Sequence, residues 1–201
     1  MRLNSLNIHI IPCVSCSWLR CVLKVAFVLF MAILLCACKP PQSGEALGVQ
    51  YPYWYWKLNQ QNLSEQLIVP VDGVKARHIA DTWGAARSQG RTHQGVDIFA
   101  KRGTAVLSTT EGIVYKVGTN TLGGKVVWVL GPNSSRHYYA HLDDYAQHIQ
   151  QGDWVEVGET LGYVGNTGNA KGTPPHLHYG IYLSTGAINP YPFLSDVNQE
   201  K

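Results

Sequence analysis

From about residue 67 onward, glycine interrupts the chain so often that little room remains for helix. The stretches between the glycines are short and rich in β-branched and aromatic residues, which is typical of strands. With 20 glycines, 10 prolines and 14% charged residues, the composition favours a turn-rich, strand-built domain over a helical bundle. The stretch 152–162 weakly echoes 103–114, consistent with a barrel or sandwich that folds over on itself. We expect strands at 79–83, 105–108, 112–117, 125–130, 137–141, 160–164 and 177–183, and one turn of helix within 143–149.

The charges and the cysteines divide the chain near residue 38. Three of the 16 basic residues and none of the 13 acidic ones precede Cys38, so the remainder of the chain has a net charge of zero. A nucleic-acid binder would be expected to have a basic face, and this balance argues against one. All 5 cysteines lie within residues 13–38. The later part therefore holds no disulfide and no thiolate metal site.

The first 37 residues have the pattern of a secretory signal. Three basic residues precede an apolar run over 25–35, which is too short for a comfortable membrane span of about 20 residues. The run ends in Leu35-Cys36-Ala37-Cys38, which resembles a bacterial lipobox with Cys38 as the lipidated residue. An uncleaved N-terminal anchor is the alternative. We expect a lipid-anchored protein of the cell envelope on the periplasmic side, and Lys39 favours the outer membrane.

Residues 38–66 are expected to form a tether between the anchor and the domain. Residues 39–50 lack a periodic apolar pattern, and five aromatic residues follow within 51–56. This aromatic segment could stack on the sugar rings of a cell wall. We favour the alternative, in which its rings pack on the domain as a strap and are mostly buried, because exposed aromatic patches are costly.

Three motifs contain most of the histidines of the domain. Residues 93–97 (HQGVD) place a histidine and a carboxylate four apart, in a tight loop that enters a strand. In residues 138–142 (YYAHL), a regular strand would put His141 on one face with His137 and Tyr139. Residues 176–178 (HLH) put two imidazoles on one strand face, about 7 Å apart. A lone histidine is more often structural, but three such motifs together indicate a metal site.

The chemistry of this set suits catalytic zinc. Two neutral imidazoles and one carboxylate are a normal zinc ligand set that leaves one position for water. The two remaining motif histidines cannot also be ligands without closing the site, so they are free to move protons. No HExxH motif supplies a glutamate as general base. A histidine must take that role, and a second must stabilise the developing oxyanion.

The three motifs, in this order, resemble those of the lysostaphin-type (LytM-like) zinc metalloendopeptidases, which degrade peptidoglycan. The resemblance runs from about residue 71 to 192 and implies an all-β fold. This is a glycine-rich antiparallel β-sheet domain of the barrel-sandwich hybrid (duplicated hybrid motif) type, expected over 67–193 with a tail at 194–201. It also implies one Zn²⁺ held by His93, Asp97 and His178, with His141 and His176 as the catalytic histidines.

The function that this resemblance implies is zinc-dependent hydrolysis of peptide cross-links in peptidoglycan, for wall remodelling or lysis, with stem peptides as substrate. Candidates for substrate contacts are Arg87, Arg91 and Tyr139, although the arginines could equally be ordinary surface residues. His137 is expected to be structural. His78 and His148 lie in no motif and are expected at the surface.

Three other functions compete with this one. A catalytically silent wall-binding lipoprotein that regulates a cell-wall amidase would share the fold, but here no motif residue is missing. A non-haem iron oxygenase also uses two histidines and a carboxylate. It would leave His141 and His176 without a purpose. A sugar-binding β-sheet module would not need so many histidines.

The anchor hypothesis predicts the effect of one substitution. Cys38→Ser should block incorporation of labelled fatty acid and signal cleavage at that position, because the thiol is the atom that is lipidated. Equal labelling of the variant and the parent in growing cells would overturn the assignment of Cys38.

Overall fold

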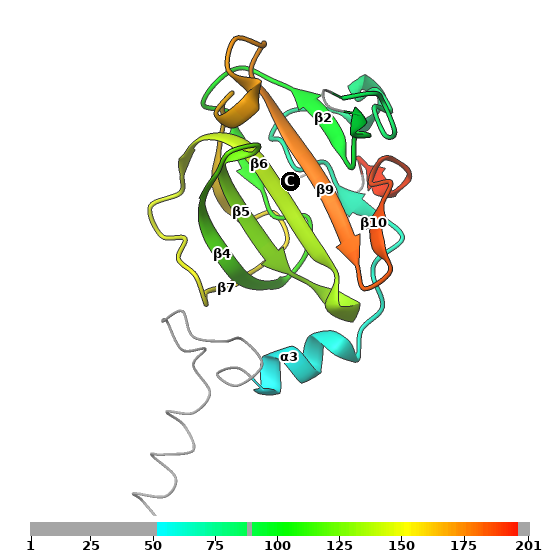
Figure 1. Cartoon of the computed structure of the whole chain (residues 1–201). Coiled ribbons are helices and arrows are strands. Elements are labelled where there is room, and N and C mark those ends of the chain that lie inside the picture. Colours follow the sequence, from blue (N-terminus) through cyan, green and yellow to red (C-terminus); the bar gives the residue numbers. More distant parts are fainter. Residues whose placement is uncertain (1–51, 88–89, 197–201) are drawn as a thin grey trace, which may run out of the picture. The chain divides into compact units, whose positions relative to one another are not determined.

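The computed structural model describes residues 52–87 and 90–196 (Figure 1). One α-helix, α3 (Pro52–Asn59), precedes the strands, and short 3₁₀ turns lie at Ala76–His78, Pro132–Ser134, Gly168–Ala170 and Tyr191–Phe193. The strands of this part are β1 (Leu67–Ile68), β2 (Val96–Phe99), β3 (Ala105–Leu107), β4 (Gly112–Asn120), β5 (Gly124–Leu130), β6 (Arg136–Tyr145), β7 (Trp154–Val155), β8 (Thr160–Val164), β9 (His176–Leu183), β10 (Gly186–Ile188) and β11 (Leu194–Ser195).

The main sheet is antiparallel throughout. Its principal order is β10-β9-β6-β5-β4-β7, with β2 added beside β9 and with β8 joining β3 to β6. Only the short pair β1 and β11 is parallel among the described strands. The all-β, antiparallel fold class expected from the sequence is confirmed.

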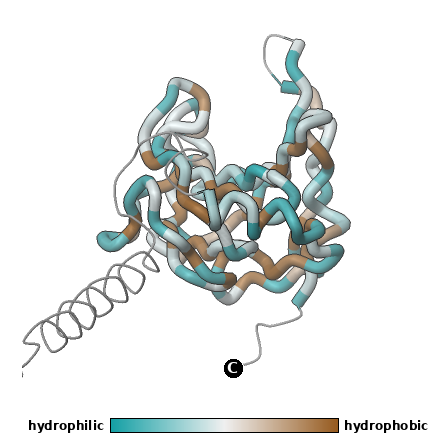
Figure 2. The backbone as a smooth tube through the Cα atoms, turned by 90° about the horizontal axis from the view of Figure 1, so that it is seen from below, coloured by the Kyte–Doolittle hydropathy of each residue, from teal (hydrophilic) through white to brown (hydrophobic). Residues whose placement is uncertain are grey.

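Alternation along the strands separates a buried face from an outer face. In Figure 2, hydrophobic and hydrophilic residues alternate along much of the tube. The inward side chains form one core that includes residues fully removed from solvent, such as Val127, Leu161, Leu177 and Ile181. On β6, the residues opposite β9 run from Arg136↔Tyr182 to Ala140↔His178. This register places the core side chains on one face of the sheet and the side chains that line the pocket on the other.

A polar network lies inside this core. The His137 ring hydrogen-bonds through Nδ1 to the Tyr179 hydroxyl at 2.8 Å and through Nε2 to the Ser135 hydroxyl at 3.0 Å. The Thr109 hydroxyl joins the Tyr139 and Tyr179 hydroxyls at 2.9 and 2.8 Å. All the polar side-chain atoms of this network therefore have partners, which is the condition for burying them without a large penalty.

Two sequence-based assignments of secondary structure are wrong, whereas the strand expected after the loop of the first histidine motif is present as β2. Segment 79–83 is not a strand. The expected helical turn in 143–149 does not form, because β6 continues through Tyr145 and pairs with β8 there. The continuation of β6 is decided by its pairing with β8, and no local pattern contains that information.

The described part of the aromatic segment, residues 52–56, lies in the helix α3 and is not an extended strap. Leu58 is buried against Ile113, and the rings of Trp54 and Trp154 lie 4.6 Å apart, centroid to centroid. Tyr53 and Trp56 are 63% and 59% exposed. The expectation that these rings are mostly buried is therefore wrong for Tyr53 and Trp56, while Trp54 does pack on the domain.

The expected signal, Cys38 and residues 39–51 of the tether lie outside the described residues, as do 197–201. Among the described helices, none is both long and apolar enough to cross a membrane.

The buried imidazole predicts how stability depends on pH. Burial lowers the pKa of His137 to about 3, against about 6.5 in an unfolded chain. Its contribution to stability is therefore fully present above pH ~6.5 and is lost as pH falls toward 3, by up to about 1.4 kcal/mol per pH unit. Urea unfolding of the metal-free protein at pH 7 and pH 5 measures this loss. His137→Gln, which does not titrate, should show a smaller loss over the same range, and equal losses in the two proteins would contradict the assignment.

Candidate metal centre and catalytic pocket

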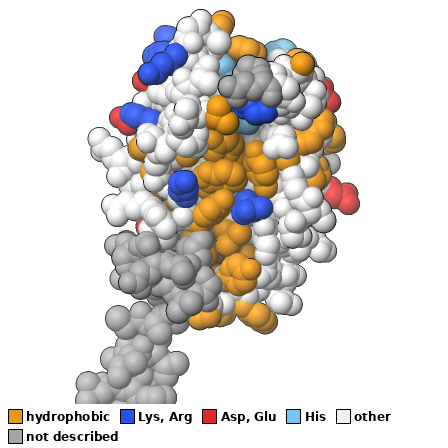
Figure 3. All heavy atoms as spheres, in the orientation of Figure 1, with side chains coloured by type: hydrophobic (Ala, Val, Ile, Leu, Met, Phe, Trp, Pro, Cys, Tyr) orange, Lys and Arg blue, Asp and Glu red, His pale blue; other side chains and the backbone are white. Residues whose placement is uncertain are grey.

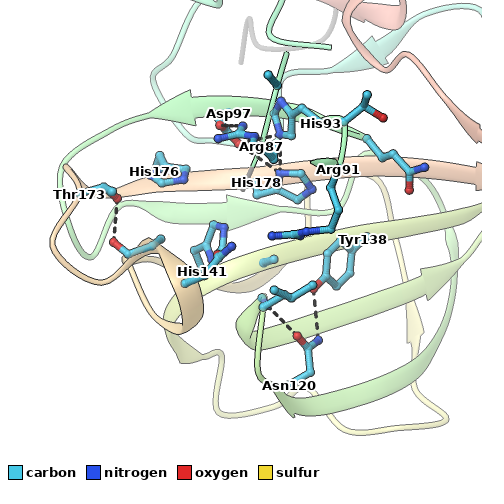
Figure 4. A pocket seen from close by; sticks show the side chains of 18 of the residues that line it. Arg87, Arg91, His93, Asp97, Asn120, Tyr138, His141, Thr173, His176 and His178 are labelled. Carbon is cyan, nitrogen blue, oxygen red and sulfur yellow. Dashed lines mark hydrogen bonds and ion pairs between the residues drawn. The ribbon is translucent and has the colours of Figure 1, made fainter. Parts of the chain in front are cut away.

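Strand β9 brings the first and third histidine motifs together. It pairs with β2 on one side, so His178 lies directly opposite Asp97. The loop before β2 passes very close to β9 at Gly95, where a Cβ atom would lie 2.5 Å from the Tyr179 carbonyl oxygen and 2.7 Å from the His178 ring. Only glycine permits this approach, which lets His93 reach the same point as Asp97 and His178 (Figure 4).

Three donor atoms form a compact triangle. His93 Nε2 lies 2.8 Å from His178 Nδ1, and Asp97 Oδ1 lies 3.1 Å from each of them. Two imidazole nitrogens and a carboxylate oxygen are the donors that Zn²⁺ accepts, and tetrahedral bonds of about 2.0–2.2 Å would separate such donors by roughly 3.3–3.6 Å. The triangle is slightly tighter than this, so the three residues fit a zinc ion with little movement.

Hydrogen bonds from the surrounding residues fix the orientation of two of these donors. His93 Nδ1 lies 2.7 Å from the Thr82 carbonyl oxygen. A carbonyl can only accept, so Nδ1 carries the proton and Nε2 keeps its lone pair for a metal. The Asp97 backbone N–H donates to Thr82 Oγ1 at 3.1 Å. Arg87 donates to Asp97 Oδ2, which leaves Oδ1 for the triangle.

The electrostatics keep Asp97 ionised. Burial by itself raises the pKa of Asp97, but the contacts with His178, His93 and Arg87 together outweigh it and hold that pKa far below its usual range. Burial lowers the pKa of His178, and the Asp97 carboxylate opposes this. A carboxylate beside a histidine with lowered proton affinity is the protonation state that a metal requires of its ligands.

His141 and His176 lie beside this triangle. Their ring centroids are 5.0 Å apart, and that of His141 is 5.9 Å from that of His178. Nδ1 of His141 donates to the Thr167 carbonyl at 2.9 Å, and Nδ1 of His176 donates to the Pro174 carbonyl at 2.9 Å. Each imidazole therefore keeps an unprotonated Nε2 when neutral. Burial, aided by the charges of His178 and His176, lowers the pKa of His141 to about 4.

A β-bulge places His141 in the pocket. Residues 140–141 of β6 together face Val126 of β5, and His141 has a left-handed φ of 64°. The side chain of His141 lines the pocket, whereas those of His137 and Tyr139 are fully buried in the core. The expectation that the three share one strand face is therefore wrong. Bulges re-aim single side chains in this way, often next to active sites.

The structure separates the candidates for substrate contacts. Arg87 and Arg91 line the pocket, and Figure 4 shows Arg91 extending past His178 toward Tyr138. Tyr139 does not reach the pocket, because it is fully buried and hydrogen-bonded to Thr109. Its assignment as a substrate contact is therefore corrected, and its neighbour Tyr138 lines the pocket instead.

Several lining residues were not foreseen. Tyr138, Trp128 and Tyr182 form an aromatic cluster on the outer face of the sheet, with Trp128 and Tyr138 centroids 4.3 Å apart. Asn120 lines the same pocket and donates to the Tyr138 hydroxyl at 3.2 Å. These side chains come from four strands, β4, β5, β6 and β9, so their proximity follows from the register. No local sequence signal identifies them.

Comparisons with known proteins agree with this geometry. The model of the family described as Peptidase family M23 matches residues 91–190. The chain is 44% identical over 124 residues to the L-Ala–D-Glu endopeptidase of Bacillus subtilis, covering 56% of this chain and 38% of that protein. The chain thus spans well under half the length of the curated relatives it matches.

For some solved structures, the similarity covers most of the compared chain. The putative glycyl-glycine endopeptidase lytM of Ruminococcus gnavus is similar at 30% identity and a TM-score of 0.52, with 76% of this chain and 72% of that one covered. The catalytic domain of lysostaphin from Staphylococcus simulans is similar at 29% identity and a TM-score of 0.52, with 57% and 90% covered. The chain therefore belongs to peptidase family M23.

Proposed function

We propose that the protein is a zinc metalloendopeptidase that hydrolyses peptide bonds in bacterial peptidoglycan. The observation that carries this proposal is the donor triangle of His93, Asp97 and His178 with two further histidines beside it. The relatives support the substrate class, since one is named an L-Ala–D-Glu endopeptidase and another lysostaphin.

His93, Asp97 and His178 would hold the metal through Nε2, Oδ1 and Nδ1, the three atoms of the triangle. When bound, zinc polarises a scissile carbonyl and makes water acidic enough to act as a nucleophile near neutral pH. Arg87 and Thr82 keep the ligands in place, so little reorganisation is needed when substrate arrives.

His141 and His176 would carry the proton transfers. With Nδ1 fixed on a backbone carbonyl, each ring presents Nε2 as the only atom that can accept or return a proton. One neutral histidine would take the proton of the attacking water on its Nε2, and the other, carrying a proton on its Nε2 as an imidazolium, would donate to the oxygen that becomes negative. The low pKa of His141 leaves it neutral at pH 7, as a base must be.

The location of the protein is a further part of the proposal. Lipid attachment at Cys38 would hold the catalytic domain at the envelope membrane, on the periplasmic side and within reach of the stem peptides of the wall. The motivation is the apolar run and the Leu-Cys-Ala-Cys sequence, and the labelling of Cys38→Ser described above tests it.

The regulator hypothesis makes the opposite prediction for activity. A silent wall-binding protein does not need an intact donor triangle or two histidines with fixed Nδ1 atoms. This structure has both, which favours the enzyme.

Substitution of the two histidines tests the proposed function. His141→Ala and His176→Ala should each keep zinc and the fold, because neither histidine belongs to the triangle. Each substitution should lower wall hydrolysis about 10²- to 10⁴-fold. Turbidity loss of purified peptidoglycan and zinc content are measured on the same samples. His78→Ala is the matched control, since His78 is exposed and lies outside the pocket lining. A wild-type protein without activity on wall would support the regulator, and a zinc-free His141→Ala would contradict this division of roles.

A further inference from the structure

The pocket has an excess of positive charge beside the metal-ligand triangle. Among the described residues that line it, the arginines are Arg87 and Arg91, and the only carboxylate is Asp97. Arg87 already contacts Asp97, and Asp97 would also face the metal. The lining therefore offers an anionic group of the substrate a favourable potential on the side where Arg91 lies.

Arg91 is held at one end of the pocket by its backbone. The backbone N–H of Arg87 donates to the Arg91 carbonyl at 2.9 Å, and Ala86 and Thr92 form a β-bridge. Figure 4 shows the Arg91 side chain reaching from this loop past His178 toward Tyr138, whereas His176 and Thr173 lie at the opposite end. The guanidinium thus enters the pocket beside the triangle, and in this view it ends between Tyr138 and His141.

The surroundings of Arg91 suit recognition of a planar anion. Tyr138 is nearly buried, and its ring centroid lies 5.8 Å from that of His178. Trp128 and Tyr182 pack with Tyr138 and line the same pocket, so the three rings form an aromatic floor. Figure 3 shows a strip of hydrophobic side chains on this face of the molecule. An apolar floor reduces competition from water and strengthens an ionic hydrogen bond above it.

We propose that Arg91 binds a carboxylate on the substrate residue adjacent to the scissile bond and so selects acidic wall peptides over uncharged ones. This inference rests on the proposed function and names the group that the pocket recognises. Arginine suits the role because its planar fork pairs with both carboxylate oxygens at once. A peptide of glycine alone would have no group for Arg91 to bind, and neither would an amidated one.

The test compares peptides that differ in one group. Synthetic stem peptides carry either a free carboxylate or its carboxamide on the residue after the scissile bond, and a second pair carries the same change on the residue before it. The full-length chain, purified in detergent with zinc, is assayed for kcat/KM on each peptide. Calorimetry on the metal-free chain gives the dissociation constants of the same peptides, which do not depend on catalysis.

For one of the two pairs, the wild-type protein should prefer the carboxylate by about 10- to 100-fold in both measurements. Arg91→Gln should reduce the ratio between the carboxylate and carboxamide peptides to near one. Arg91→Lys should keep part of this preference, because the charge remains but the planar fork is lost. Arg77→Gln, at an exposed arginine outside the pocket lining, should leave activity and ratio unchanged.

Equal affinity of the wild-type chain for carboxylate and amide in both pairs would overturn the role of Arg91, as would an Arg91→Gln ratio equal to that of wild type. If Arg91→Gln cleaves no peptide, the ratio of its dissociation constants decides. Failure of the wild-type enzyme to cleave any peptide or purified wall would instead contradict the proposed function, and the binding ratio would still test Arg91.

Discussion

Asp97 is contacted by side chains from three sides, and the pocket is arranged around that carboxylate. His93 and His178 approach Oδ1, and Arg87 donates to Oδ2. Burial alone would favour the protonated acid, so the charge persists only because these contacts outweigh the loss of water. A metal ion at the triangle would take over the attraction that the imidazoles now supply. The same contacts that hold the carboxylate ionised also preform the ligand set, which lowers the cost of binding the metal.

The two faces of the sheet have different roles in holding the pocket residues together. Inside, His137, Tyr139, Tyr179 and Thr109 satisfy one another and tie β6 to β9. Outside, the same two strands present His141, His176 and His178 to the pocket, and the bulge lets β6 contribute side chains to both faces. A left-handed backbone at a non-glycine residue costs free energy. It persists here because the flanking strand pairs, and the bond from the His141 N–H to the Gly123 carbonyl at 2.7 Å, fix the backbone on both sides.

The sequence predicted more of the site than of the sheet. Ligand chemistry and motif order were enough to group the five residues that the structure brings together, because metal ligands need particular residue types. The spacing of glycines predicted a β domain, but the continuation of β6 through Tyr145 depends on β8, a partner farther along the chain. Parity counting misplaced His141 and Tyr139 because it assumes a regular strand, and a bulge leaves no local sequence signal in Tyr-Tyr-Ala-His. The aromatic floor under Arg91 depends on register across three strands, which the sequence does not encode locally.

The central claim is that His93, Asp97 and His178 form one zinc site, and metal content measures it most directly. Purified wild-type protein, dialysed against metal-free buffer and analysed by inductively coupled plasma mass spectrometry, should contain close to one zinc per chain. His93→Ala and Asp97→Ala each remove one of the three donors, so zinc affinity should fall by more than about 100-fold and most of the metal should be lost on dialysis. His148→Ala, at an exposed histidine outside the pocket lining, should keep its zinc. Near-stoichiometric zinc in both ligand variants would contradict the account.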